Sequence, residues 1–405
     1  MFSPANTSHI TLTIPSVDTD LQVLEFIGRE MLNKPYHFEI ELVSERTDLD
    51  LDALINQTAY LAFGPSGKGV HRIIYGIEQG DSGKRLTRYR ISLRPQLTYL
   101  GHSFNQRIFQ QMTAPAIIAA VLEEYGLLAS TGYHFQFGPY VYPERDYCTQ
   151  YDESDLHFLQ RLCEEEGLSF HFQHGEDNHL LVFGDDASVF PRLDPLNYQQ
   201  DSGLSADHEV VRAFGVRLET RSSQVTWRDY DFEQPKLQME AGYSSEFFPT
   251  LEVYDYPGRF TDRARGKHLA KRSLERLRTD FELAEGKSDA YLASGHFLAL
   301  AGHPRQQWNA TSGCSTKSST KAGNRRCWKS RYLTSPLPPG EGPGVRVAQA
   351  TPTSSRATAT ASPPRPGTFP TARRWNTANP RYSAARPPRS PALPARKSTA
   401  TNTAA

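Results

Sequence analysis

The periodicity of the apolar residues changes at Gly167, and this change constrains the fold more than any other feature of the 405-residue chain. Before Gly167, apolar residues recur at the spacing of one buried helix face, at Leu156, Phe158, Leu159, Leu162 and Cys163. After it, Leu168, Phe170 and Phe172 alternate with polar residues, as in a half-buried strand. The sequence therefore predicts a helix that leads directly into a hairpin, whose second strand lies at 180–183.

The ends of this helix carry suitable capping residues. Ser154 or Asp152 can accept hydrogen bonds from the first turn, and Gly167 suits the left-handed conformation that ends many helices. The apolar face of the helix and the strand that follows are expected to form core, at Phe158, Leu162, Phe170 and Phe172.

A long ordered set of residues in this region also carries a family resemblance. Its members are Arg145, Tyr147, Cys148, Gln150, Tyr151, Glu153, Ser154, Asp155, Phe158, Arg161, Leu162, Glu164, Glu165, Glu166, Gly167, Phe170 and Phe172. Further matches are residues 253–260 and the two short segments 295–297 and 302–304. Together they resemble the VgrG family, the spike-tip proteins of bacterial type VI secretion, related to the tail hubs of contractile phages. The resemblance covers roughly residues 8–309.

This resemblance implies an α+β fold, with two small antiparallel β-barrel-like lobes and packing helices, as in a phage tail hub. It implies a homotrimer whose six lobes form a ring that matches the hexameric ring of the Hcp tube protein. The expected role is structural, namely symmetry adaptation and force transmission, with effector or other spike proteins as further partners. Relatives continue into a neck and a β-helix needle, and neither signature is readable in residues 310–405.

The rest of the sequence is divided by its local patterns. Alternating apolar runs in the first hundred residues predict antiparallel strands of a small barrel, and helices are predicted from Thr113 and from Thr261. We predict a first β-barrel lobe at 1–100 and a helix-hairpin unit with the second lobe at 101–235. The helical and strand end of the hub module follows at 236–309, and a tail at 310–405.

The predicted tail differs from the head in composition. From Ala310 onward there are 16 lysines and arginines and one acidic residue, so the tail carries +15 and the head −15. Pro, Ser, Thr, Ala and Arg dominate without periodicity, which predicts a disordered segment. A nucleic-acid arm, a linker and out-of-frame translation of a GC-rich gene are three interpretations, and the family resemblance favours the last.

Several segments invite a chemical interpretation that their context does not support. Residues 64–69 look like a phosphate loop, but Ala62 and Gly69 break the motif and strands flank it on both sides. His171, His174 and His179 surround one hairpin without an obvious carboxylate. We therefore expect no catalytic residue, no cofactor and no metal site.

Charged residues near the helix are better explained by structure. Glu164, Glu165 and Glu166 are consecutive at a helix end and point in three directions, unlike paired catalytic carboxylates. Arg145 and Arg161 are expected to form ion pairs that position the helix, with the nearby acids Asp146, Glu153 and Asp155. The predicted helix after Thr261 has a basic face, which we interpret as solvated, with no nucleic-acid partner.

The sequence also bears on the compartment. Four cysteines without a C-x-x-C pair favour free thiols in a reducing compartment. No signal peptide or apolar run of membrane-spanning length is present, so we expect no stable membrane insertion. The expected course is synthesis in the cytoplasm and export by the type VI machine.

Two alternatives remain open. A tail hub or baseplate protein of a contractile prophage has the same expected fold, and only neighbouring genes would separate it from a secretion spike. A hydrolase with a site around the histidine hairpin is the alternative from a different class.

Overall fold

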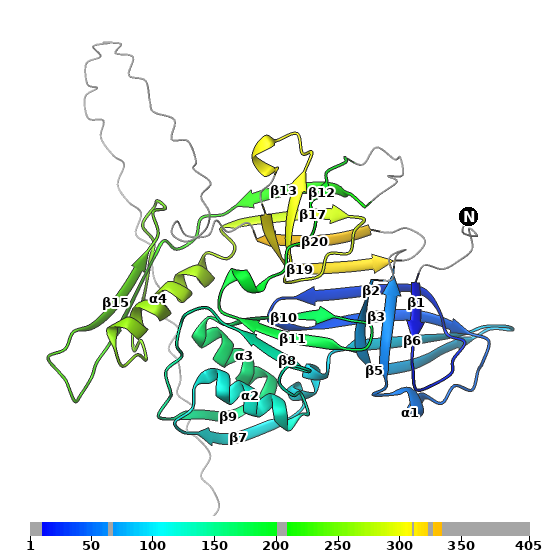
Figure 1. The fold of residues 1–405 in the computed structure, drawn as a ribbon, viewed down its shortest axis with the longest axis horizontal. Helices are drawn as coiled ribbons and strands as arrows, with labels where there is room; N and C mark the ends of the chain where they lie inside the picture. The colour runs from blue at the N-terminus through cyan, green and yellow to red at the C-terminus, as the bar shows by residue number, and fades with distance from the viewer. Residues whose placement is uncertain (1–9, 64–67, 201–208, 310–311, 323–326, 334–405) are drawn as a thin grey trace, which may run out of the picture. The chain divides into compact units, whose positions relative to one another are not determined.

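The protein is a mixed α+β structure in which strands predominate (Figure 1). The structure, a computed structural model, describes residues 10–63, 68–200, 209–309, 312–322 and 327–333. One large sheet runs in the order β1-β4-β5-β6-β3-β2-β19-β20-β17-β13, and three small sheets accompany it. The predicted fold class of antiparallel lobes with packing helices is confirmed.

The first arm of the large sheet comes from the N-terminal hundred residues. Its strands are β1 (Ile10–Thr13), β2 (Gln22–Met31), β3 (Lys34–Ser44), β4 (Thr58–Phe63), β5 (Gly69–Ser82) and β6 (Thr87–Arg94). All neighbours in this arm pair antiparallel. The short helix α1 (Leu51–Leu54) connects β3 to β4, and the 3-10 turn Gln96–Gly101 leads from β6 into the next layer. As expected, strands β4 and β5 flank the glycine-rich segment, of which residues 64–67 lie outside the described residues.

The second arm of the large sheet comes from much later in the chain. Its strands are β13 (Val211–Leu218), β17 (Glu282–Ser288), β18 (Phe297–Ala301), β19 (Ser312–Ala322) and β20 (Cys327–Leu333), with the short β12 (Leu196–Asn197) paired to β18. β19 pairs antiparallel with β2 from Lys317 opposite Met31 to Ala322 opposite Phe26. Figure 1 shows the blue and the yellow-orange arms meeting at these two strands.

The prediction of a structureless tail from residue 310 is therefore wrong for β19 and β20. Apolar periodicity could not reveal β19, because its buried positions include Ser315, Ser318 and Thr320. Backbone hydrogen bonds to β2 and β20, and to β18 at its first residues, hold it in the sheet. Residues 334–405 of the predicted tail lie outside the described residues.

A layer of helices and hairpins packs on the first arm. It consists of β7 (Phe104–Phe109), α2 (Ala114–Glu124), β8 (Tyr133–Gln136), β9 (Cys148–Ser154), α3 (Asp155–Glu166), β10 (Ser169–His174) and β11 (His179–Gly184). The predicted caps are confirmed, since Ser154 accepts a hydrogen bond from the amide of His157 and Gly167 is left-handed with φ of 72°. Thr113 likewise caps α2.

The core of the first arm and of this layer is continuous. Phe158, Leu162 and Phe170 are fully buried and Phe172 is 6% exposed, as the sequence predicted. They belong to one apolar cluster that extends from Ile14 to Phe183. The described contacts thus cross the predicted border at residue 100, and the division of the chain into independently folding regions stays a prediction.

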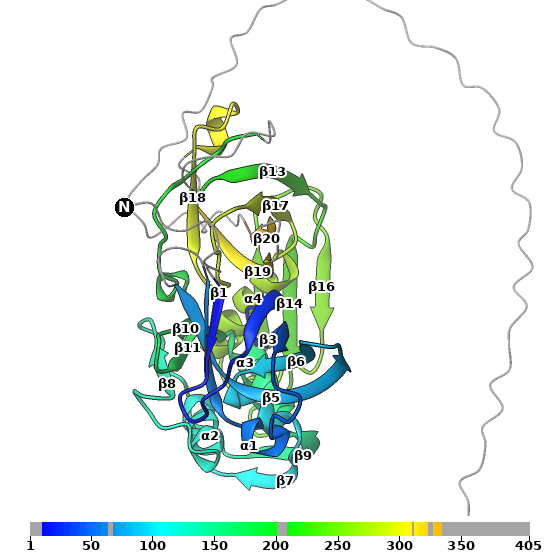
Figure 2. The same cartoon turned by 90° about the vertical axis from the view of Figure 1, so that its right-hand side faces the viewer.

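A small outer subdomain follows β13 in the sequence. It contains β14 (Gln224–Asp229), β15 (Met239–Ser244), β16 (Glu252–Asp255) and α4 (Arg263–Leu277). Figure 2 shows β14 and β16 beside α4, whose buried face includes Leu269, Ala270 and Leu274. The predicted cap at Thr261 is wrong by one residue. Asp262 has the extended backbone of a cap, and its shorter, charged side chain accepts from the amide of Arg265.

Candidate functional site at the joint of the two sheet arms

The joint between the two arms is organised around the carboxylate of Glu30, which is 3% exposed. Its Oε1 accepts a hydrogen bond of 2.8 Å from the hydroxyl of Tyr291, and its Oε2 accepts one of 3.1 Å from Ser318. The imidazole of His174 lies 3.6 Å away, too far for a hydrogen bond but close enough for electrostatic attraction. One side chain of β2 therefore holds the second arm and faces the β10–β11 hairpin.

A buried arginine supplies charge to the joint. Arg72 of β5 is fully buried, and its guanidinium carbon lies 3.2 Å above the centre of the Phe38 ring. Its side-chain nitrogens form no hydrogen bond within the described part of the chain. Burial lowers the pKa of Arg72 to about 10, so it remains protonated at neutral pH.

Because the joint contains two buried charges, substitution of either residue should lower the stability of the protein strongly. Burial raises the pKa of Glu30, but the neighbouring groups His174, Arg72 and Tyr291 outweigh this and hold the pKa below its ordinary value. Glu30 and Arg72 therefore attract each other electrostatically inside the protein, although their side chains do not form a direct ion pair. Removal of either one would leave an unpaired charge in a medium of low polarity.

Three histidines gather beside this charge pair. His174 and His179 are opposite each other in the β10–β11 hairpin, and Nδ1 of His71 lies 3.3 Å from Nδ1 of His179. The pKa of His179 is lowered to about 3, mainly by burial and in addition by the neighbouring His174, His71 and Arg72. Burial also lowers the pKa of His174, against the attraction of Glu30. Burial therefore disfavours the protonated form of all three imidazoles.

The third histidine of the predicted cluster lies elsewhere. His171 faces the opposite side of β10, where it neighbours Phe190 and His296, and a Cβ on Gly295 would lie 2.5 Å from its own Cβ. Burial lowers its pKa to about 4. In the described residues, no three side chains of His, Cys, Asp or Glu are arranged to hold a metal. The absence of a metal site in the whole chain stays a prediction.

Sequence reasoning missed most of the joint. Glu30 could have been found, because it occupies an inward position two residues from Gly28 and four from Phe26, where an acid is unexpected. No local signal marks Ser318 or Tyr291 as its partners. They are 288 and 261 residues away in the chain.

A second buried carboxylate joins α3 to α4. Glu166, 2% exposed, accepts two hydrogen bonds of 2.6 Å from Arg265 and one from Arg145. Glu165 pairs with Arg145 and Arg161, and Glu164 pairs with Arg276 at 2.9 Å. Glu164 thus has a partner of its own, whereas Glu165 and Glu166 both contact Arg145, so the expectation that the three glutamates point in three directions holds only in part.

The arginines expected to position α3 do so with partly different partners. Arg161 binds Glu153 at 2.6 Å, as predicted, whereas Arg145 binds the end of the helix rather than Asp146 or Asp155. Asp155 is fully buried and accepts hydrogen bonds from Asn105, Arg107, Tyr125 and Gln150. These networks hold α3 rigidly between its neighbours.

Half of the basic face of α4 is occupied by contacts within the protein. Arg265 binds Glu166, Arg276 binds Glu164, and Arg272 binds Glu275 and the carbonyl oxygen of Asp185. The interpretation of that face as solvated is therefore wrong for Arg265 and Arg272, whose side chains are only 12% and 23% exposed, while the absence of a nucleic-acid partner stays a prediction. The described residues also include no helix that is long and apolar enough to cross a membrane.

Comparison with known proteins gives a consistent result. Residues 29–312 match the family model described as phage tail baseplate hub. The chain is 58% identical over 315 residues to the type VI secretion system spike protein VgrG4b of Pseudomonas aeruginosa, and 57% identical over 314 residues to the spike protein VgrG5 of the same organism. Each alignment covers 76% of this chain but only 39% and 40% of the relative, so the chain spans about two-fifths of the curated relatives' length.

Solved structures share the fold at low sequence identity. The E. coli c3393 protein, a type VI secretion component described as similar to T4 bacteriophage tail proteins, has a TM-score of 0.64 at 20% identity and covers 82% of this chain and 79% of its own. The 43 kDa tail protein of prophage MuSo2 from Shewanella oneidensis has a TM-score of 0.58 at 11% identity, with coverage of 80% and 98%. These likenesses concern the fold alone.

Proposed function

Since the chain belongs to the phage tail baseplate hub family, we propose that it is the hub module of a type VI secretion spike. The family is one of structural tail proteins, and the role of this chain is to connect a spike to the tube beneath it. The proposal is favoured over other hubs by the two spike proteins that share 57% and 58% of their aligned residues with it.

The observation that carries this function is the single sheet with two antiparallel arms. One chain contributes a first arm of β1–β6 and a second arm of β13 and β17–β20, joined by the β2–β19 pairing. Three such chains around a three-fold axis would present six arms to a six-subunit Hcp ring. Ring closure of this kind satisfies contacts between identical subunits without leaving open edges.

Force transmission requires that the two arms behave as one body. The backbone ladder is continuous across the joint, and Glu30 fastens both arms and faces the hairpin layer. The turn between β2 and β3 adds two hydrogen bonds, from Asn33 N to Phe170 O at 3.0 Å and from Phe170 N to Asn33 Oδ1 at 2.7 Å. A load on one arm is therefore passed to the other through hydrogen bonds and buried side chains.

The test is binding of the full chain to purified Hcp rings, followed by sedimentation and light scattering. We expect complexes of three chains per ring. A complex of one chain per ring, or no binding at any salt concentration, would contradict the proposal. Export from cells by the type VI machine is the corresponding expectation in vivo.

The second candidate, a tail hub of a contractile prophage, is supported by the family description and by the fold of the MuSo2 tail protein. It predicts tight binding to a phage tail-tube protein in the same assay and weak binding to Hcp. Binding of the chain to Hcp and to the tail-tube protein, measured first separately and then in competition, distinguishes the two candidates.

A further inference from the structure

The outer subdomain has one face that the fold does not use. Its three strands pair in the order β15-β14-β16, and the inner face of this sheet packs on α4 through Val225, Met239 and Ala241. The alternation of the strands places Arg228 opposite Glu240, and Thr226 opposite Tyr254, on the other face. That outer face is open to solvent.

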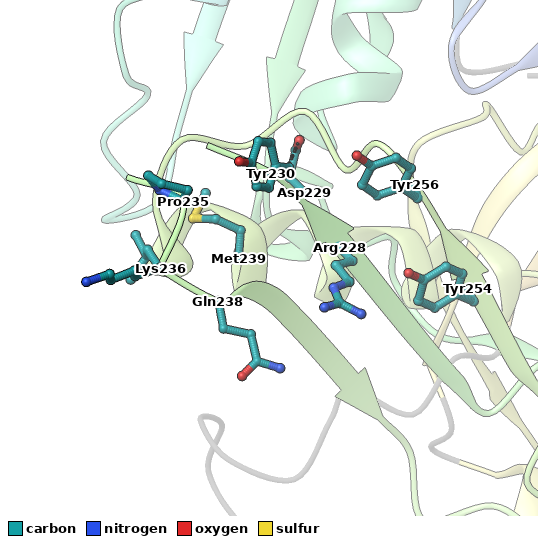
Figure 3. Close-up of a pocket in the computed structure, with 10 residues that line it drawn as sticks. Arg228, Asp229, Tyr230, Pro235, Lys236, Gln238, Met239, Tyr254 and Tyr256 are labelled. Atoms are coloured by element: carbon teal, nitrogen blue, oxygen red, sulfur yellow. Dashed lines mark hydrogen bonds between the residues drawn. The ribbon is translucent and has the colours of Figure 1, made fainter. Parts of the chain in front are cut away.

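An open depression of about 720 Å³ lies on this face (Figure 3). Its lining includes Arg228, Tyr230, Lys236, Gln238, Tyr254 and Tyr256, which we call the tyrosine platform. The three tyrosines are 59%, 56% and 58% exposed. In Figure 3, Tyr254 and Tyr256 lie next to each other on one side of Arg228.

The polar groups of the platform are not engaged by the protein. Within the described part of the chain, the three tyrosine hydroxyls, the Arg228 guanidinium and the Gln238 amide form no hydrogen bond or ion pair. In contrast, the hydroxyls of Tyr125, Tyr133 and Tyr142 donate to carboxylates elsewhere in the fold. Neither packing nor hydrogen bonding explains why aromatic and planar polar side chains gather here.

The chemistry of the platform points to a carbohydrate. The flat C–H face of a sugar ring stacks on an exposed tyrosine, while guanidinium and amide groups bind hydroxyl, acetamido or carboxylate oxygens in pairs. A small apolar ligand requires a more enclosed and more apolar cavity than this open depression. From this geometry we propose that the tyrosine platform binds an oligosaccharide, with an oxygen-bearing substituent on Arg228.

The charge around the platform disfavours the main competing ligand. Single-stranded nucleic acid also stacks on tyrosines, but it requires a groove of positive charge along its phosphates. Arg228 and Lys236 are outnumbered by acidic residues on the same strands and loops, namely Asp229, Asp231, Glu233, Glu240, Glu252 and Asp255. A neutral or sparsely charged glycan suits this surface better. The inference does not depend on the hub role.

Isothermal titration of the full chain tests the site with three probes: a tetramer of N-acetylglucosamine, a β-1,4-linked tetramer of glucose and a short oligothymidylate. We expect weak binding of at least one of the two glycans, with a Kd of about 0.1–1 mM, since the platform is shallow. Tyr254→Ala and Tyr256→Ala should each weaken it at least about tenfold, and Tyr254→Trp should preserve it because the stacking surface remains.

The control is Tyr151→Ala, which removes a tyrosine that is 72% exposed on β9, away from the platform. It should bind glycans like the unchanged chain. Circular dichroism confirms that each variant is folded. Failure of both glycans to bind at about 10 mM, equal binding by Tyr254→Ala, or preferential binding of the oligothymidylate would each overturn the proposal.

Discussion

At the joint, the hydroxyl of Tyr291 donates to Glu30 and its ring lies 4.7 Å from that of Phe63, whereas Tyr254 and Tyr256 of the tyrosine platform stand in solvent. Both regions combine tyrosines with an arginine and an acid or amide. At the joint these groups are buried and bind one another, so each is needed for stability. On the platform they bind nothing within the described chain, so they add no side-chain hydrogen bond or ion pair to the stability of the fold. The difference separates side chains that hold the fold from side chains available to a partner.

The largest loss of stability is expected from Glu30→Ala. This change leaves Arg72 as a buried charge without its carboxylate, and it should lower the free energy of unfolding by about 3–5 kcal/mol. Glu41→Ala on the neighbouring strand is the control, because the side chains of Glu41 and its partner Arg90 are 41% and 53% exposed and the loss should stay within about 1 kcal/mol. Urea unfolding of both variants measures the contrast. Equal losses would mean that the joint is not a buried charge pair.

The apolar core provides a scale for the joint. Phe158→Ala should cost about 3–5 kcal/mol, because the ring is fully buried and stacks 5.7 Å from Phe109. A loss below about 0.5 kcal/mol would place Phe158 on the surface, contrary to the structure. If Phe158→Ala lowers the free energy of unfolding by much more than Glu30→Ala, the joint contributes less to stability than the core. The two arms are then less firmly coupled than proposed.

Acid should lower the free energy of unfolding through the buried histidines of β10 and β11. Histidines with a lowered pKa bind fewer protons in the folded than in the unfolded chain. Their stabilisation is therefore present above about pH 6.5 and is lost as pH falls toward their folded pKa values, about 4 for His171 and about 3 for His179. Each should contribute a loss of about 2 kcal/mol by pH 5.

His179→Gln tests this dependence. Between pH 7.5 and pH 5, the variant should lose about 2 kcal/mol less stability than the unchanged chain, because glutamine does not titrate. An identical pH profile for His179→Gln and the unchanged chain would show that His179 is accessible to protons in the folded state.

The smallest effects come from a pair of matched tyrosine changes. Tyr291→Phe removes a donor to the buried Glu30 and should cost about 1–3 kcal/mol. Tyr254→Phe removes a hydroxyl without a partner in the described chain and should change stability by less than about 0.5 kcal/mol. Thermal unfolding of both variants gives the comparison directly. A clear loss for Tyr254→Phe would assign the platform a structural role instead of a binding role.

Local sequence patterns predicted one part of this molecule well. The helix α3, its caps at Ser154 and Gly167, and the buried Phe158 and Phe170 follow from interactions within a few residues, which are written in the order of the amino acids. The family resemblance added the fold class and the hub role. The cap of α4 was missed by one residue because Thr261 and Asp262 are both good capping types and only the backbone decides between them.

What the sequence determined by itself is the set of elements whose stability is local, namely amphipathic helices, capped ends and alternating strands. The tertiary structure alone decided that β19 lies beside β2, with Ser318 at Glu30, although 288 residues separate the two. It also decided that Arg145 binds Glu166 and that three tyrosines share one solvent face. The physical reason is that a buried polar contact depends on which surfaces the chain brings together, and no local periodicity records that choice.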